Sequence, residues 1–260
     1  MNLLMLRSAG FKLAFYVATA LFLVLGSPLL LGPRSWAMAA LKGHAHTTLW
    51  LMRVIAGTRV AVRGRENLPD GAYLVAAKHQ SAWDTIGLIV LFPDPALIMK
   101  AELLNIPVYG WFCRKFGMIP IRRETGPSAL RTMLAQARDR ARNGRQVLVF
   151  PEGTRRLPGA APAYKSGILL LYDALQLPCV PLALNSGRFW PRRGAIQPGT
   201  IVVDIGEVIP AGLPRQEFRE TLIERIEVPT QQLAELETAQ NEQRAGDGGR
   251  AEAGRNIKRT

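Results

Sequence analysis

The sequence contains little cysteine and little histidine, and this scarcity excludes several kinds of site. Its two cysteines, Cys113 and Cys179, lie far apart and neither belongs to a C-x-x-C pair, so a zinc or dithiol redox site is not expected. The three histidines are His44 and His46, in an apolar N-terminal segment, and His79. His79 is therefore the one histidine in the remainder of the chain.

Acidic residues are also scarce relative to basic ones. The chain has 33 Lys and Arg against 20 Asp and Glu, a net charge of +13, which favours polyanions such as nucleic acid, anionic lipid or a phosphorylated ligand. The basic residues are dispersed, and no aromatic and basic recognition motif is present. Nucleic acid is therefore not expected as a partner, and no metal or cofactor is expected either.

Residues 13–32 form an uncharged apolar run between Lys12 and Arg34. Its length is about what a helix needs to cross the core of a bilayer. A secretory signal peptide is one alternative, because the small residues 37–39 imitate a cleavage site, and a buried core helix is another. The run is longer than a usual signal core and a second semi-apolar segment follows at once, which favours a membrane anchor.

That second segment, residues 35–57, mixes apolar residues with charges and carries Trp36 and Trp50. Such a pattern is typical of an amphipathic helix at a membrane interface. Basic residues such as Lys42 and Arg53 come after the first apolar run, and the positive-inside bias then places the main domain in the cytoplasm. We expect residues 1–57 to be membrane-anchoring helices, either transmembrane or monotopic, in the inner (cell) membrane.

From about residue 58 the pattern is that of an α/β domain. Short apolar runs predict strands, and longer amphipathic runs predict helices at 86–91, 128–143 and 166–175. Their alternation predicts a mixed, largely parallel sheet flanked by helices over residues 58–230, followed by a polar tail, 231–260, that is disordered at its end. The strands are expected at 60–62, 72–77, 96–99, 118–121, 146–150, 179–184 and 200–205.

The stretch KHQSAWDT at residues 78–85 follows one of the predicted strands. Ser81 and Asp84 have the spacing of a capping box, which places His79 before a helix and allows Asp84 to face its imidazole. A carboxylate on one ring nitrogen makes the other a better general base. The alternative is that Asp84 only caps the helix and His79 only ends the strand. Ligands bind at the carboxyl ends of parallel strands, which favours the functional interpretation.

Two further motifs follow predicted strands. In FPEGTR, residues 150–155, Gly153 permits a tight turn that presents Glu152 and Arg155, and an arginine grips a phosphate through two hydrogen bonds. The block 117–123 ends in Arg123, and Lys100 lies upstream. The alternatives are an ordinary turn with a solvated salt bridge and simple surface charges.

Together these motifs resemble the 1-acyl-sn-glycerol-3-phosphate acyltransferases of the glycerolipid acyltransferase superfamily. H-x4-D corresponds to residues 79–84, the G-x-I-x-I-x-R type block to 117–123, F-P-E-G-T-R to 150–155, and a late V-P block to 180–182. Residues 164–167 resemble a further family segment. One departure is Pro120, where many members carry an aromatic residue; it puts the packing near Arg123 in doubt.

The resemblance implies a glycerol-3-phosphate acyltransferase-like fold and a role for each matching residue. His79 would take the proton from the acceptor hydroxyl, and Asp84 would orient His79. The phosphate of the acceptor would be bound by residues from the other motifs, namely Lys100, Arg123, Glu152, Gly153, Thr154 and Arg155. The V-P block would shape the pocket of the acyl donor.

The implied reaction moves an acyl chain from acyl-CoA or acyl carrier protein to the sn-2 hydroxyl of 1-acyl-sn-glycerol-3-phosphate, giving phosphatidic acid. The implied partners are the membrane lipid acceptor, the thioester donor and an anionic membrane surface. The motifs do not separate this acceptor from another lyso-lipid such as lyso-ornithine lipid or a lysophospholipid. A serine hydrolase is disfavoured because the sequence lacks a G-x-S-x-G elbow and Ser81 suits a helix cap.

Overall fold

The computed structural model describes residues 2–122 and 126–257, with side chains through residue 236. Within them, a seven-stranded sheet has the order β1-β7-β6-β2-β5-β3-β4, and β6 with β7 is its one antiparallel pair. This confirms the predicted mixed, largely parallel sheet. The strands are β1 Thr58–Arg63, β2 Leu74–Ala77, β3 Pro95–Lys100, β4 Ile119–Ile121, β5 Gln146–Val149, β6 Cys179–Leu184 and β7 Gly199–Ile205.

The helices are partly those that the sequence predicts. α5 and α6 confirm the expected helices, whereas the predicted helix at 86–91 is replaced by the short α3 and a 3-10 turn, Leu88–Val90. α4 and the first turns of α8 were not predicted. The helices are α1 Leu3–Leu25, α2 Arg34–Leu51, α3 Asp84–Gly87, α4 Tyr109–Phe116, α5 Gly126–Arg142, α6 Gly167–Leu175, α7 Ser186–Phe189 and α8 Arg215–Ile257.

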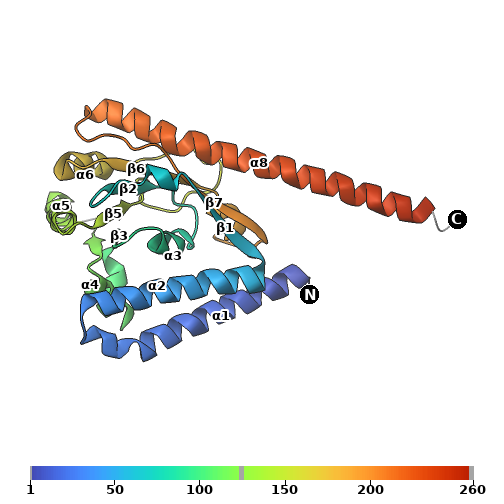
Figure 1. Ribbon diagram of the computed structural model, residues 1–260, viewed down its shortest axis with the longest axis horizontal. Coiled ribbons are helices and arrows are strands. Elements are labelled where there is room, and N and C mark those ends of the chain that lie inside the picture. Colours follow the sequence, from blue (N-terminus) through green and yellow to red (C-terminus); the bar gives the residue numbers. More distant parts are fainter. Residues whose placement is uncertain (1, 123–125, 258–260) are drawn as a thin grey trace.

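The sheet separates two hydrophobic cores. On one face, α5, α6 and α8 pack against alternate strand residues such as Ala76 and Val147. On the other, α3 and the N-terminal helices pack against the residues between them, such as Ala77 and Leu148. Because side chains alternate across a strand, strands buried on both faces read as the continuous apolar runs seen in the sequence. Figure 1 shows this layering, with α8 and α1 as the outer layers.

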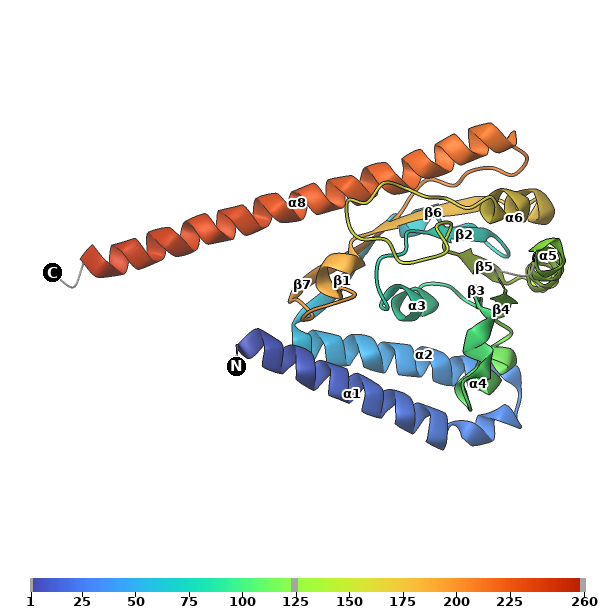
Figure 2. The ribbon, with the colours of Figure 1, turned by 180° about the vertical axis from the view of Figure 1, so that it is seen from behind.

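α1 and α2 form an antiparallel helical hairpin that lies along the α3 face of the domain (Figures 1 and 2). Two contacts of buried α1 residues attach it: Phe11 packs edge-on against Trp190 with ring centroids 5.2 Å apart, and Ser8 accepts a 2.9 Å hydrogen bond from the Ile196 amide. From α2, the Lys42 ammonium donates to two carbonyls just before β3. The hairpin is therefore continuous with the core of the domain.

The apolar run predicted at 13–32 is not one helix. α1 begins at Leu3, ends at Leu25, and is followed by a 3-10 turn, Ser27–Leu30, that contains Pro28. The prediction took Lys12 as a boundary, but Lys12 lies inside the helix and its ammonium donates to the Gly194 carbonyl at 3.0 Å. Among the described residues, α1 is long and apolar enough to cross a membrane, with mean hydropathy 1.8 and 11% of its apolar window buried.

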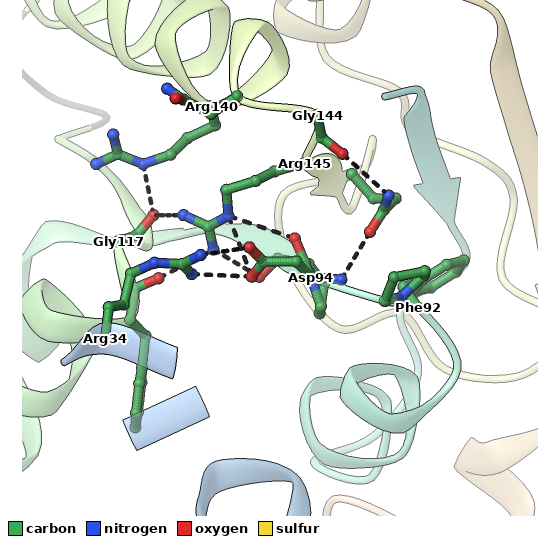
Figure 3. A network of polar contacts seen from close by, with 12 residues as sticks. Arg34, Phe92, Asp94, Gly117, Arg140, Gly144 and Arg145 are labelled. Carbon is green, nitrogen blue, oxygen red and sulfur yellow. Dashed lines mark hydrogen bonds and ion pairs between the residues drawn. The ribbon is translucent and has the colours of Figure 1, made fainter. Parts of the chain in front are cut away.

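A polar network lies at the edge of the sheet where β3 and β5 begin (Figure 3). Arg145 is 4% exposed and donates to carbonyls at the start of β3 and the end of α4, including Phe116 at 2.9 Å and Pro95 at 3.1 Å. Asp94 pairs with Arg145 and with Arg34 of α2. The network therefore fixes the hairpin to the amino edge of the sheet.

The position of β4 in the sheet agrees with its sequence. Pro120 lies in β4, which is an edge strand, and an edge tolerates a residue without an N–H donor.

α8 runs as one helix across residue 230 to Ile257, where the sequence predicts a tail that is disordered at its end. The stretch after residue 230 is rich in Gln, Ala and Glu, which are good helix formers. The division into 1–57, 58–230 and 231–260 stays a prediction.

Candidate active site

The predicted motifs gather at the carboxyl edge of the sheet. β2 pairs in parallel with β5 and with β6, and β3 pairs in parallel with β5. Because neighbouring parallel strands end at the same edge, the segments that follow them lie together. His79 follows β2, FPEGTR follows β5, and Lys100 ends β3.

His79 and Asp84 form the predicted pair. The His79 Nδ1 lies 2.9 Å from Oδ2 of Asp84. The carboxylate is fully buried and also accepts from the backbone N–H groups of Gln80 at 2.7 Å and Ser81 at 2.9 Å. Asp84 therefore contacts the imidazole and also closes the turn before α3, while its orienting role stays a prediction.

The helix boundary at this turn differs from the prediction. The residue at the N-cap of α3 is Trp83 rather than Ser81. One of the two reciprocal hydrogen bonds of a capping box is present, because Asp84 accepts from the Ser81 amide. The Ser81 hydroxyl accepts at 3.1 Å from the Trp83 amide, one residue earlier than the box requires. The short turn, rather than a regular first helical turn, brings Asp84 back to His79.

Ser186 is a site residue that the sequence analysis missed. It lies at the start of α7, directly after β6, and is fully buried. Its hydroxyl donates to Oδ1 of Asp84 and lies 2.9 Å from the Ser81 hydroxyl. The signal available was a polar pair after a buried strand, the same signal that points to His79.

The chemistry of this arrangement depends on its hydrogen bonds. The Asp84 carboxylate accepts hydrogen bonds from two backbone amides and from the hydroxyls of Ser81 and Ser186. With the carboxylate as acceptor toward His79 too, the His79 Nδ1 carries the hydrogen and Nε2 has a free lone pair. The ring stacks on Phe150 with centroids 4.0 Å apart, and 12% of the His79 side chain is exposed. Nε2 of His79 is therefore the ring nitrogen that is available to accept a proton.

The loop 150–156 is attached to the segment that carries His79. Gly153 has φ +67°, in the left-handed region that favours glycine, and its amide donates to the Phe150 carbonyl at 2.9 Å. The Arg156 amide donates to the His79 carbonyl at 2.8 Å. The tight turn and this bond fix the FPEGTR loop beside the histidine.

The predicted phosphate-binding residues differ in their surroundings. Thr154, Arg155 and Lys100 have exposed side chains at the carboxyl edge, whereas Glu152 is 2% exposed. Its carboxylate pairs with the Lys78 ammonium at 3.1 Å. Burial raises the pKa of Glu152 although the charge of Lys78 opposes this. Arg123 lies outside the described residues.

The V-P block lies inside β6 and supports the histidine strand. Val180 pairs with Val75 of β2, and both are fully buried. The Leu182 carbonyl accepts from the Lys78 amide at 2.9 Å. The block therefore helps to fix the residue that precedes His79, while its predicted role at the acyl donor stays a prediction.

The part of the chain that carries the candidate site matches a known protein family. Residues 59–185 match the family model described as Acyltransferase. The chain contains an acyltransferase-family domain. This match includes the His79 and Asp84 pair and the loop 150–156, and it ends just before Ser186.

Two curated relatives carry names that specify a reaction. A 1-acyl-sn-glycerol-3-phosphate acyltransferase of Pseudomonas aeruginosa is 39% identical over 63% of this chain and 64% of its own length. The human 1-acyl-sn-glycerol-3-phosphate acyltransferase alpha is 32% identical over 68% of this chain and 62% of its own length. The alignments thus span less than two thirds of the length of these two relatives.

A solved structure shares the fold. The crystal structure of the 1-acyl-sn-glycerophosphate (LPA) acyltransferase PlsC from Thermotoga maritima aligns with a TM-score of 0.73 at 22% sequence identity. The alignment covers 88% of this chain and 97% of that chain. It therefore extends beyond the acyltransferase domain defined by the family model.

Proposed function

We propose that this chain transfers an acyl chain from the thioester of acyl-CoA or acyl carrier protein to the sn-2 hydroxyl of 1-acyl-sn-glycerol-3-phosphate, giving phosphatidic acid. The observation that carries the proposal is the 2.9 Å contact between His79 and Asp84 at the carboxyl edge of the sheet. The names of the curated relatives support the choice of acceptor. Neither observation separates the two donors.

In the proposed mechanism, Nε2 of His79 accepts the proton of the sn-2 hydroxyl as its oxygen attacks the thioester carbonyl carbon. The carbon–sulfur bond of the resulting tetrahedral intermediate then breaks. The imidazolium returns the proton to the departing sulfur, so an ester and a thiol form and His79 is regenerated. The carboxylate of Asp84 stabilises the transient positive charge on the ring, since it is buried beside Nδ1.

Cations at the same edge are placed to bind the acceptor phosphate. Arg155 and Lys100 are exposed, and no carboxylate among the described residues forms an ion pair with either. A planar guanidinium matches phosphate through two hydrogen bonds, so Arg155 is the proposed main contact and Lys100 a second one. The proposal assigns Arg123 to the same phosphate. Because Glu152 is buried on Lys78, we assign it to holding the loop rather than to direct contact.

Attachment to a membrane is the proposed role of the helical hairpin. Large apolar side chains of α1 are exposed, including Leu13 at 67% and Val24 at 67%, and Trp36 and Trp50 of α2 are each 61% exposed. Exposed apolar helices with tryptophans are typical of membrane interfaces. We propose that the hairpin anchors the protein in the inner membrane with its catalytic domain on the cytoplasmic face, where soluble thioester meets membrane-borne acceptor.

The test is an acceptor panel with the purified full-length chain in detergent micelles and a radiolabelled acyl donor, run once with acyl-CoA and once with acyl carrier protein. The proposal predicts that 1-acyl-sn-glycerol-3-phosphate is acylated at least about tenfold faster than neutral or zwitterionic lyso-lipids, because they lack the phosphate monoester that the cations bind. Transfer to lyso-ornithine lipid or a lysophospholipid, with none to 1-acyl-sn-glycerol-3-phosphate, would replace the proposed acceptor.

A further inference from the structure

Lys78 and His79 leave β2 on opposite faces of the sheet. The preceding residues alternate, with Ala76 in the core beneath α8 and Ala77 in the core beneath α3. The same period of two directs Lys78 toward α8 and His79 toward α3. The two neighbouring residues therefore connect the site to different layers of the fold.

The ammonium of Lys78 is buried between two carboxylates. Lys78 is 3% exposed, and its Nζ lies 2.8 Å from both oxygens of Glu227 and 3.1 Å from Oε1 of Glu152. A buried ammonium is costly unless it is paired. Glu152 belongs to the FPEGTR loop, whereas Glu227 belongs to α8, so one side chain joins the loop to the C-terminal helix.

α8 presents Glu227 on a well-packed helix. The helix is attached to the sheet by Phe218, Leu222 and Ile226, all fully buried, and the Phe218 ring stacks on Tyr172 of α6 with centroids 3.7 Å apart. The Tyr164 hydroxyl donates to Oε1 of Glu227 at 2.9 Å. The carboxylate is thus fixed both by its helix and by a neighbouring hydroxyl.

We infer that Glu227 is a positioning residue of the proposed active site, acting through Lys78 on the segment that carries His79. The inference rests on the proposed acyltransferase function and adds a residue that lies outside the matched domain, 59–185. The Lys78 backbone is bonded to β6, and the His79 carbonyl is bonded to Arg156 of the FPEGTR loop. Without the charge of Glu227, Lys78 keeps one carboxylate, and the His79 segment and the loop lose their shared attachment to α8.

The first test replaces Glu227 by glutamine, which preserves size and an oxygen for Tyr164 but removes the charge. We expect kcat of the full chain in micelles to fall about 10- to 100-fold while the KM for the acyl donor changes less than about threefold, since small displacements of catalytic groups cost rate. Glu227→Asp, which keeps the charge, should recover part of the loss. Glu224→Gln on the exposed side of the same helix is the matched control and should leave kcat unchanged.

A purely structural role for Glu227 gives a different result. In that case Glu227→Gln lowers the midpoint of thermal unfolding, but kcat per folded molecule equals that of Glu224→Gln, and the inference is overturned. A double-mutant cycle with Lys78→Met adds a second criterion. If Glu227 acts through Lys78, Glu227→Gln causes no further loss in the Lys78→Met background; independent, multiplying losses contradict the inference.

Hydrogen exchange gives a readout that needs no activity. Amides of residues 78–80 and 152–156 should exchange faster in Glu227→Gln than in Glu224→Gln, while amides of β7 exchange equally in both. Equal exchange at residues 78–80 and 152–156 in the two variants overturns the inference. Absence of acyl transfer by the unmodified chain overturns the proposed function instead, and the exchange result distinguishes the two failures.

Discussion

The imidazole of His79 and the carboxylate of Asp84 meet at 2.9 Å although the two residues are five positions apart in the sequence. Side chains five apart on a continuous helix diverge, so the contact depends on the turn between β2 and α3. Asp84 itself holds that turn by accepting from the amides of Gln80 and Ser81. One buried carboxylate therefore shapes the loop and orients the base.

Replacing Asp84 by asparagine should nearly abolish acyl transfer. An amide in place of the carboxylate no longer fixes the hydrogen on Nδ1 or stabilises the imidazolium, and in a comparable triad this change lowers kcat by about 10⁴-fold. We expect a loss of at least about 10²-fold for this pair, with little change in KM. Steady-state kinetics of the purified variant measures it, and a tenfold or smaller loss is incompatible with the orienting role.

Replacing Ser186 by alanine should destabilise the folded protein. The change removes a hydroxyl that donates to a fully buried carboxylate, and hydrogen bonds to charged groups contribute about 1.5–3 kcal/mol. Denaturant unfolding should show a loss of this size. Ser166→Ala, at an exposed serine without a side-chain cap bond, should change the free energy of unfolding by less than about 0.5 kcal/mol. Equal effects of the two substitutions would refute the assignment.

Replacing Arg155 by alanine should weaken acceptor binding. The exposed guanidinium is the proposed phosphate contact, and its loss should raise the KM for the acceptor about tenfold or more, with a smaller effect on the KM of the donor. Arg155→Lys keeps the charge but not the planar fork and should recover only part of the affinity. Arg131→Ala, at an exposed arginine of α5, is the control. A KM that responds equally to Arg155→Ala and Arg131→Ala would exclude the contact.

The ion pairs of Asp94 should make the free energy of unfolding depend on pH in the acid range. Burial raises the pKa of Asp94, but the hydrogen bond from Arg34 and the charges of Arg145 and Lys42 outweigh it, so the folded pKa lies below the usual 3.8. The unfolded state then binds more protons, and the contribution of Asp94 is present above pH 3.8 and is lost as the pH falls through the folded pKa. Denaturant unfolding at pH 5 and pH 3 should show a larger loss for the native sequence than for Asp94→Asn. An equal loss in both proteins would contradict this account.

Much of the sheet was predictable because its central strands β2, β5 and β6 are buried on both faces. Each of the seven expected strands is present within about two residues of its predicted bounds. A short continuous apolar run bounded by Gly and Pro is typical of a buried strand. The hairpin was harder to predict, because Lys12 reads as the end of an apolar run in sequence but is satisfied by the Gly194 carbonyl in the fold. Local charge does not reveal a tertiary hydrogen bond.

The site was predictable where its residues are close in sequence. His79 and Asp84 lie within one short motif, and the FPEGTR loop signals its own turn through Gly153. Ser186 and Glu227 were missed because they are far in sequence from the residues they contact. Ser186 is 102 positions from Asp84, and Glu227 is 149 positions from Lys78. A glutamate in a charged helix gives no local sign that it faces a buried lysine, so only the packing of α8 reveals it.

The central claim is that His79 is the base of an acyl transfer, and the most direct test is the rate of His79→Ala with 1-acyl-sn-glycerol-3-phosphate and a labelled acyl donor. Removing a general base should lower kcat/KM by about 10²–10⁴-fold, while the variant stays folded and attached to membranes. His46→Ala, at an exposed histidine of α2, should retain the full rate. If His79→Ala transfers acyl chains as fast as His46→Ala, the account is wrong.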